Sequence, residues 1–384
     1  MGKASSQTVL ILGGGVGGVA AANRLRKHLD RRHRIVLINR EEDFSFAASY
    51  LWVMNGSREP KQVTRPLKRI ERRGIEVVIG TVEFIDPLTR VVKVSGKNIH
   101  ADHLIVTLGA DWATDRVLGL AEFGHTFATL NGAQKLRKEL ENLKSGRITV
   151  VTSSPLYKCP AAPYEAALLI DSGLRKRGVR DKVQVLLRTA EPAPMPTAGK
   201  NVSEAVKSIL TSRSIDYRPA VQITGVEYGK IYFGDEDEKT DLLVYMPPIA
   251  APRVISDSLL AQPDGWIHAD ANTLRTEFDN VYAIGDNTQI LLGIGKPLPR
   301  AGVFAHAQAL AVAGSIIAKI NGKEAVGIFD GHGGCFIEIG SGKAAFGSGN
   351  FYAQPAPEIT MKPPSRLRHW GKVAFELNVL RRWL

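Results

Sequence analysis

Short apolar runs, separated by polar or glycine-rich turns, recur along the chain. The first run, Thr8–Leu12, is followed by a glycine-rich turn, by a helix-compatible stretch to about Leu29, and by a second run, Arg34–Asn39. Apolar runs of this length that alternate with helical stretches predict parallel strands joined by crossover helices. The N-terminal part of the chain is therefore predicted to form a β-α-β unit.

The same pattern returns later in the chain. Arg147–Val151 and Val183–Leu187 predict strands of a second β-α-β unit, whereas Asn280–Asp286 predicts a strand that returns to the first. A chain of 384 residues exceeds the usual size of a single core. The prediction is an α/β fold with two Rossmann-like nucleotide-binding domains and a C-terminal segment. The expected boundaries are 1–115 and 266–322 for the first domain, 116–265 for the second, and 323–384 for the C-terminal segment.

Three runs between these units predict a small antiparallel set of strands: Gly74–Ile85, Arg90–Val94 and Ile99–Ala101. An apolar strand that ends at Gly109-Ala110 then predicts the point at which the chain leaves the first domain. A polar stretch from about Gly124 to Ser145 follows and is typical of a helix. These elements complete the expected path from the first domain to the second.

The turn after the first predicted strand reads Gly13-Gly14-Gly15-Val16-Gly17-Gly18, a G-x-G-x-x-G motif. Gly13 permits the tight turn, Gly15 lets a pyrophosphate approach the backbone, and Gly18 lets the helix pack on the strand. The amino-terminal end of that helix adds partial positive charge for the phosphates. Between a strand and a helix, the motif predicts a dinucleotide cofactor, and a glycine-rich turn without a ligand is the alternative.

A second motif indicates which dinucleotide is bound. The strand Asn280–Ile284 delivers Gly285-Asp286, and a carboxylate there accepts a hydrogen bond from the ribityl chain of FAD, although it could also cap a turn. Gly302 then opens the Ala-rich helix Val303–Ile320, whose dipole would stabilise a reduced, anionic flavin. The residues expected to bind FAD are Gly13, Gly15, Gly18, Asn39, Arg40, Glu41, Val82, Gly109, Gly285, Asp286, Lys296 and Gly302.

The ribose contact is left open by the sequence. An acidic residue is expected near the end of the second strand, where this chain has Asn39, followed by Arg40 and Glu41. Either Asn39 or Glu41 could accept a hydrogen bond from the ribose hydroxyl groups.

The second β-α-β unit lacks the glycine motif. Its first turn, Thr152–Pro160, contains two prolines and Tyr157, which would keep a pyrophosphate away from the backbone N–H groups. The second domain is therefore predicted to keep the Rossmann scaffold without a nicotinamide site.

The formal charge of +12, from 50 basic and 38 acidic residues, favours anionic partners. Nucleic acid is not expected, because the basic residues are spread along the chain and no nucleic-acid motif is present. No apolar run is long enough to span a bilayer, and no signal peptide is expected, because the N-terminus leads directly into a strand. Acidic lipid headgroups and an anionic substrate are therefore the anionic partners that remain possible. No metal site is expected.

The C-terminal tail has the pattern of an amphipathic helix that Ser365 could cap. Its apolar residues recur at three- and four-residue steps: Leu367, Trp370, Val373, Ala374, Leu377, Leu380 and Leu384. Its basic residues are Arg366, Arg368, Lys372, Arg381 and Arg382. The pattern favours a helix lying on an anionic membrane surface. The alternative is a helix docked on the protein core or on a second subunit, in a homo-oligomer.

The chain has two cysteines, Cys159 and Cys335, which composition alone would describe as buried, inert thiols. Their surroundings change this interpretation. The run Cys159–Glu165 and the run Gly334-Cys335-Phe336 resemble the sulfide:quinone oxidoreductases and the related flavoprotein subunit of flavocytochrome c sulfide dehydrogenase. The resemblance covers nearly the whole chain, and the tail His369–Glu376 is similar to the membrane-binding tail of the quinone-reducing branch.

The resemblance implies a disulfide-reductase-like FAD fold in which Cys159 and Cys335 meet beside the flavin. Hydrosulfide would attack a Cys159–Cys335 disulfide, leaving a persulfide on Cys159 and a thiolate on Cys335 that passes two electrons to FAD. The product would be sulfane sulfur or polysulfide. Glu165 would be the local acid or base, or else a mere surface carboxylate. A membrane quinone would reoxidise the flavin in a pocket walled by Phe336, Phe346 and Phe351, which could equally be apolar core.

Two departures from the family pattern stand out. Many quinone-reducing members have a third cysteine in the connecting segment, where this chain has Ala128. Some relatives attach FAD through a cysteine in the segment that reads Phe44–Ala48 here, so FAD is expected to be non-covalent. Two other functions stay open, a type II NADH:quinone oxidoreductase and a flavoprotein subunit that passes electrons to a cytochrome. The expected location is the membrane surface.

Overall fold

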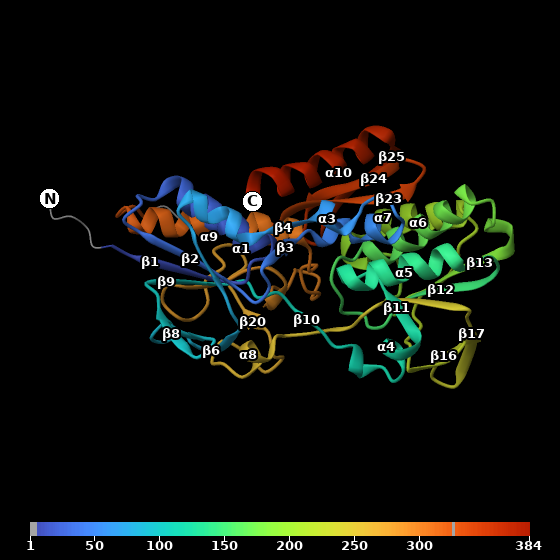
Figure 1. Ribbon diagram of the computed structural model, residues 1–384, viewed down its shortest axis with the longest axis horizontal. Coiled ribbons are helices and arrows are strands. Elements are labelled where there is room, and N and C mark those ends of the chain that lie inside the picture. The colour runs from blue at the N-terminus through green and yellow to red at the C-terminus, as the bar shows by residue number, and fades with distance from the viewer. Residues whose placement is uncertain (1–5, 325–326) are drawn as a thin grey trace.

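The computed structural model describes residues 6–324 and 327–384. Two five-stranded parallel sheets form the two halves of the molecule, and a three-stranded antiparallel sheet with the C-terminal helix α10 (Arg366–Asn378) lies along its upper side (Figure 1). This architecture confirms the predicted α/β fold with two Rossmann-like domains and a C-terminal segment that carries a helix. The domain boundaries themselves stay a prediction.

The first sheet contains the predicted N-terminal β-α-β unit. All of its pairings are parallel. In spatial order its strands are β21 (Val281–Ala283), β9 (His103–Val106), β1 (Thr8–Leu12), β2 (Arg34–Asn39) and β5 (Glu76–Ile79). As expected, β21 returns from far along the chain to join it.

One prediction about this half is partly wrong. The run Gly74–Ile85 is split at Gly80, whose N–H donates to the carbonyl of Asn39. Its first part, β5, continues the parallel sheet beside β2, and only its second part enters the antiparallel set. That set consists of β6 (Val82–Asp86), β7 (Val91–Val94) and β8 (Lys97–His100).

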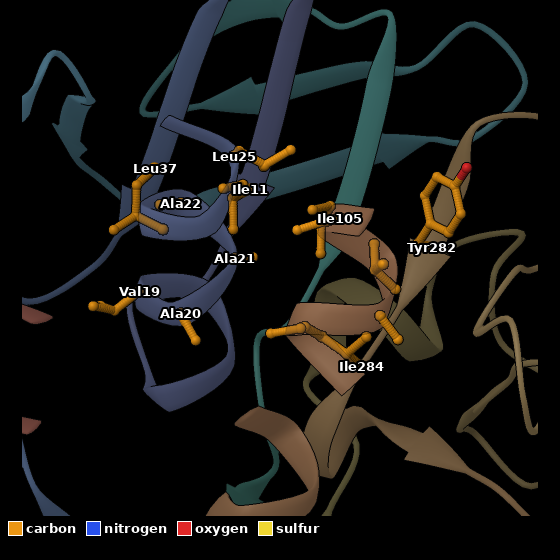
Figure 2. Close-up of a cluster of buried hydrophobic side chains, with 14 of the residues drawn as sticks. Ile11, Val19, Ala20, Ala21, Ala22, Leu25, Leu37, Ile105, Tyr282 and Ile284 are labelled. Carbon is orange, nitrogen blue, oxygen red and sulfur yellow. The ribbon is translucent and has the colours of Figure 1, made fainter. Parts of the chain in front are cut away.

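Helix α1 (Val16–His28) covers this sheet together with α9 (Gly302–Ile320). Figure 2 shows the small residues Ala20, Ala21 and Ala22 of α1 among the larger side chains of the strands and α9. Within the described residues, α9 alone is long and apolar enough to cross a membrane, but 56% of its most apolar window is buried inside the protein. Its packing against α1 makes α9 a core helix.

The second sheet repeats the arrangement with α6 (Ala162–Lys176) as its crossover helix. Its strands in spatial order are β11 (Gly124–Thr126), β18 (Leu242–Met246), β12 (Gly146–Thr152), β13 (Val183–Arg188) and β14 (Asp216–Arg218). Two further helices, α5 (Leu130–Asn142) and α7 (Lys200–Ser212), flank it. The stretch predicted as one helix from about Gly124 therefore begins with a strand, because β11 pairs with β18 at the edge of the sheet.

Short elements complete the two halves. The paired strands are β3 (Asp43–Ser45) with β4 (Thr64–Pro66), β10 (Asp111–Trp112) with β19 (Ile249–Ala250), β20 (Ile267–His268) with β22 (Thr288–Gln289), and β15 (Gly225–Glu227) with β16 (Lys230–Phe233) and β17 (Glu236–Lys239). The short helices are α2 (Tyr50–Met54), α3 (Pro60–Val63), α4 (Leu120–Phe123) and α8 (Arg253–Ser256).

The C-terminal sheet consists of β23 (His332–Gly340), β24 (Lys343–Asn350) and β25 (Glu358–Ser365). Strand β23 contacts α6 of the second half, and α10 packs on β24. The side chain of Ser365 caps α10 by accepting from the N–H of Arg368, as predicted. The helix does not run to the end of the chain, because a π-helical turn, Val379–Trp383, follows it.

Candidate active site between the two Rossmann-like units

The glycine turn between β1 and α1 leaves open space at one position. A Cβ atom on Gly13 would lie 2.2 Å from the carbonyl oxygen of Thr107, and one on Gly18 would lie 1.9 Å from that of Gly13. A Cβ on Gly15 would have no atom within 4 Å. Gly13 and Gly18 are therefore required by the packing of the protein itself. The missing side chain at Gly15 serves no contact within the protein, which suits a ligand that approaches the backbone there.

Asn39 at the end of β2 has a role inside the protein. Its Oδ1 accepts from the N–H of Gly14 at 2.8 Å, and its Nδ2 donates to the carbonyl of Glu41 at 2.8 Å. The side chains of Arg40 and Glu41 are exposed and form an ion pair at 3.0 Å. Asn39 thus holds the glycine turn, and Glu41 is the more accessible of the two candidates for the ribose.

The Gly285-Asp286 segment lies beside the first turns of helix α9. Gly285 has a φ of 76° and donates its N–H to Gln308 of α9 at 2.7 Å. Burial raises the pKa of Asp286, while the nearby cations Lys158 and Arg300 oppose this shift. An acid surrounded by two cations at this place fits the expected contact with a polar cofactor chain.

The remaining residues expected to bind the cofactor are spread more widely. Gly109, with a φ of 76°, donates its N–H to Asn287 at 3.2 Å and leaves open space where a Cβ would stand. Gly302 starts α9 next to Val16, the first residue of α1. Val82 is buried in the core of the antiparallel set, and Lys296 is exposed in a turn. Gly109 and Gly302 therefore lie near the glycine turn and the Gly285 segment, whereas Lys296 has no described contact that ties it to them.

The two cysteines, 176 positions apart in sequence (335 − 159), meet in the structure. Cys159 lies in the turn before α6 and Cys335 in β23, and both face a cavity of about 130 Å³. Cys159 has a φ of 56°, a conformation that residues other than glycine rarely adopt outside functional sites. Its N–H donates to the carbonyl of Arg300 at 2.7 Å, which ties the turn to the start of α9.

The cysteines differ in acidity. The structure records both as free thiols. The interaction between their side chains lowers the pKa of Cys335 and raises the pKa of Cys159 well above its ordinary value, and burial adds to the rise at Cys159. Cys335 is therefore the sulfur that holds a negative charge more readily.

Glu165 is buried beneath the cysteines in the first turn of α6. Its carboxylate accepts a hydrogen bond from the ammonium group of Lys372, which α10 contributes from the other end of the chain. Burial raises the pKa of Glu165 to about 7, although Lys372 acts in the opposite direction. Glu338 of β23 also lies close to this pair and accepts from His369 of α10 at 2.9 Å. Glu165 is thus a buried group that can exchange a proton near neutral pH. The alternative prediction, a surface carboxylate, is wrong, because the side chain is buried.

The three phenylalanines predicted to wall one pocket do not share it. Phe351 lines the cysteine cavity, together with Phe304. Phe336 and Phe346 instead pack against each other, with ring centroids 4.6 Å apart, and Phe336 lies next to Gly371 of α10. The reason is the alternation of side chains along β23, which places Phe336 on the face opposite to its neighbour Cys335.

Helix α10 turns a polar face inward and an apolar face outward. Lys372 and Glu376 are buried, and Glu376 binds Arg58 at 2.8 Å and Ser49 at 2.6 Å. The exposed residues at successive steps of three and four are Leu367, Trp370, Ala374 and Leu377. The predicted apolar face is therefore split, because Leu380 and Leu384 pack into the core of the first half.

Two groups near the cysteines were not found from the sequence. Lys372 was counted only as one of several cations in the tail, although His369, Lys372 and Glu376 recur at helical spacing and mark a polar face. Glu191, after β13, stands in no motif of the sequence, and it lines the cysteine cavity beside Tyr157. In the parts of the chain that the structure describes, no group of three or more His, Cys, Asp or Glu side chains could hold a metal ion.

Comparison with known proteins identifies the family of the chain. The pyridine nucleotide-disulphide oxidoreductase family matches residues 7–309. The mitochondrial sulfide:quinone oxidoreductase of Dictyostelium discoideum is 28% identical over 86% of this chain and 74% of its own, and the sulfide-quinone reductase of Aquifex aeolicus is 26% identical over 96% and 89%. The X-ray structure of the sulfide:quinone oxidoreductase from Aquifex aeolicus superposes with a TM-score of 0.91 at 25% identity, covering 98% of this chain and 91% of that one. The chain belongs to the pyridine nucleotide-disulphide oxidoreductase family and, within it, to the sulfide:quinone oxidoreductases.

Proposed function

We propose that this protein is a peripheral membrane enzyme that oxidises sulfide and passes the electrons, through non-covalently bound FAD, to a membrane quinone. The observation that carries the proposal is the meeting of Cys159 and Cys335 in one cavity between the two Rossmann-like units. Distant cysteines with opposite pKa shifts suit a redox pair better than inert packing.

The chemistry begins with the pair in its disulfide form. Hydrosulfide attacks Sγ of Cys159, the Cys159–Cys335 bond breaks, and Cys335 leaves as a thiolate. Cys159 then carries a persulfide, and the electron pair released from sulfide resides on Cys335. Among the free thiols the pKa of Cys335 is lowered, by the interaction with Cys159 and by nearby Lys372, and this acidity supports Cys335 as the leaving thiolate. Further hydrosulfide would release the sulfur as sulfane sulfur or polysulfide.

Glu165 is the proton acceptor in this scheme. Hydrogen sulfide must lose a proton before it attacks, and a carboxylate with a pKa of about 7 can accept it at neutral pH. Lys372 holds Glu165 in place and, together with the net positive charge of the chain, favours an incoming anion.

The residues of the first unit suit FAD. The open space at Gly15 would take the pyrophosphate, Asp286 the ribityl chain, and Glu41 the ribose. Gly302 lies next to Val16 of α1, and Gly109 donates its N–H to Asn287 beside Asp286. FAD supplies a two-electron acceptor for the Cys335 thiolate. The segment Phe44–Ala48 contains no cysteine, which supports non-covalent binding.

The outer face of α10 supports membrane attachment. Leu367 and Trp370 are 81% and 64% exposed, and Arg366 and Arg368 lie beside them. An exposed apolar stripe flanked by cations is typical of helices that lie in the interface of an anionic membrane. Phe351 stands in the cysteine cavity, whereas Phe336 and Phe346 lie under α10 and remain candidates for the quinone side.

The experiment mixes purified protein with sulfide and, separately, with NADH under anaerobic conditions, and follows flavin absorbance at about 450 nm. We expect bleaching by sulfide alone, reversal by a soluble quinone, and a loss of at least about a thousandfold in Cys335→Ser, because the attacked bond no longer exists. Bleaching by NADH with sulfide inert would instead assign the protein to the NADH-oxidising class. Reversal by a cytochrome but not by a quinone would favour the flavocytochrome-like alternative.

A further inference from the structure

A second buried acid lines the cysteine cavity and has no part in the scheme above. Glu191 is 4% exposed, and its carboxylate accepts three hydrogen bonds from hydroxyl groups. Tyr157 donates to Oε1, Tyr164 donates to the same oxygen at 2.7 Å, and Thr152 donates to Oε2 at 3.1 Å. Three donors on one buried carboxyl group form a closed hydrogen-bond network, which is costly to leave incomplete.

This network occupies the edge of the second sheet where a dinucleotide would bind. Thr152 ends β12, Tyr157 lies in the following turn, Tyr164 lies in the first turn of α6, and Glu191 follows β13. In a Rossmann unit the acid after the second strand points outward and binds the ribose of the dinucleotide. Glu191 stands near that place but points inward, so the protein's own phenol groups donate the hydrogen bonds that the hydroxyl groups of a ribose would donate.

The turn held by this network carries Cys159. Tyr157 is two residues before Cys159, and its hydroxyl also lies 3.4 Å from the carbonyl of Pro160 on the other side. A cysteine with a φ of 56° keeps that conformation only where its surroundings impose it. Glu191 therefore fixes the turn from the cavity side, while the bond from the Cys159 N–H to Arg300 fixes it from the side of α9.

We propose that Glu191 is a positioning residue that holds the turn from Thr152 to Ala161, through Tyr157 and Tyr164, so that Cys159 stays in bonding distance of Cys335. The network replaces the ordering that a bound dinucleotide would give to this turn. The inference rests on the proposed redox pair, because it assigns Glu191 to the geometry of that pair. It adds a residue that neither the motifs nor the charge of the site pointed to.

The test measures closure of the disulfide, which needs neither sulfide nor quinone. The FAD-loaded protein is reduced, freed of reductant, and treated with a small disulfide-forming oxidant, and the loss of free thiol is followed by alkylation and mass spectrometry. We expect Glu191→Leu to slow formation of the Cys159–Cys335 bond by about tenfold or more, because displacement of a reacting atom by even 1 Å costs up to about a hundredfold. Glu191→Gln, which keeps an acceptor oxygen, should retain more of the rate.

Asp171→Asn is the matched control. Asp171 is also a buried acid of the second half, and it pairs with Arg175 at 2.9 Å and with Arg180, away from the cysteine cavity. We expect Asp171→Asn to lower the thermal midpoint while the closure rate stays that of the wild type. Equal slowing in both variants would show simple destabilisation and overturn the inference, as would an unchanged rate in Glu191→Leu. Failure of the wild type itself to close the bond would instead refute the proposed redox pair, and the inference with it.

Discussion

The two β-α-β units of this protein share one scaffold and treat their first turn in opposite ways. In the first unit, the turn between β1 and α1 is built from glycines, and Asn39 at the end of β2 holds it by one hydrogen bond to Gly14. In the second unit, the turn between β12 and α6 contains prolines and Tyr157, and Glu191 after β13 holds it through buried phenols. In both units a polar residue at or just after the end of the second strand holds the turn.

The helices that follow these turns also differ in the charge of their first turns. The first turn of α1 contains no acidic residue, which leaves its positive end free for phosphate, whereas that of α6 contains Glu165. The first unit thus keeps open space beside bare backbone. The second unit fills that space with side chains and uses the turn to present Cys159. One Rossmann scaffold can thus leave its first turn open, and another can fill the same turn with side chains and place a cysteine there, while both keep parallel strands.

The largest effect is expected from closing the first turn. Gly15→Val would place two methyl groups in the only open position of the motif, with no atom of the protein within 4 Å of the new Cβ. The variant should therefore fold but purify without bound flavin, as measured by the ratio of absorbance at about 450 nm to that at 280 nm. A variant that retains full flavin content would refute the placement of the pyrophosphate at Gly15.

Gly173→Ala provides the matched control for that variant. Gly173 lies within α6, and a Cβ there would also meet no atom within 4 Å. Alanine in place of glycine within a helix stabilises it by roughly 0.5–1 kcal/mol. Gly173→Ala should therefore keep its flavin and unfold at a slightly higher temperature, which separates loss of a ligand site from the general effect of filling an open glycine.

The contrast between the units explains what could be predicted from the sequence. Glycines, apolar runs and prolines act locally, so the parallel strands, the open turn at Gly15 and the closed turn at Tyr157 followed from their order in the chain. The run around Gly80 was misassigned, because only its pairing with β2 decides that Glu76–Ile79 joins the parallel sheet. Pairing partners far apart in sequence leave little local signal.

The candidate site depends still more on long-range contacts. Cys159 and Cys335 were brought together by resemblance, whereas Lys372 and Glu191 were not found, because each acts through a partner on a distant element. On α10, an apolar stripe and a polar stripe recur with the same helical period. The sequence alone does not show that the polar stripe, which contains Lys372, faces the protein. Phe336 was grouped with Phe351 because the sequence does not show which face of β23 lines the cysteine cavity.

A second prediction tests how the second unit is connected to the membrane. Helix α10 reaches that unit through Lys372 and leaves Trp370 and Leu377 exposed. Burial of an apolar side chain contributes about 1.5–3 kcal/mol, so Trp370→Ala with Leu377→Ala should weaken binding to vesicles that contain anionic lipid by about a hundredfold. Activity with a soluble quinone should stay unchanged. Cosedimentation with vesicles measures the first effect, and quinone reduction in solution measures the second.

The control for that variant removes exposed apolar side chains elsewhere. Leu118 and Tyr228 are 83% and 91% exposed in the second half, away from α10. Their replacement by alanine should leave vesicle binding unaltered. If both double variants bind vesicles as the wild type does, the outer face of α10 is not the membrane contact.

The smallest expected effect concerns the acid that distinguishes the first turn of α6 from that of α1. Burial raises the pKa of Glu165 from 4.5 to about 7. Glu165 should therefore contribute a rise with pH, with an inflection near 7, to the rate of flavin reduction by sulfide in the wild type, and Glu165→Gln should lack this contribution. The informative quantity is the ratio of the two rates at each pH, because the ionisation of sulfide itself cancels in it. We expect this ratio to change by less than about tenfold.

The pH dependence of the free energy of unfolding gives an independent measurement of the protonation of Glu165. Between pH 4.5 and about 7 the folded protein binds more protons at Glu165 than the unfolded chain does, so the free energy of unfolding should fall as pH rises, by roughly 3 kcal/mol over that interval. Glu165→Gln should lack this slope. Glu338→Gln removes a neighbouring charge that raises the pKa of Glu165, and should move both inflections to lower pH. A wild-type slope that survives in Glu165→Gln would place the titrating group elsewhere and leave Glu165 as a structural partner of Lys372.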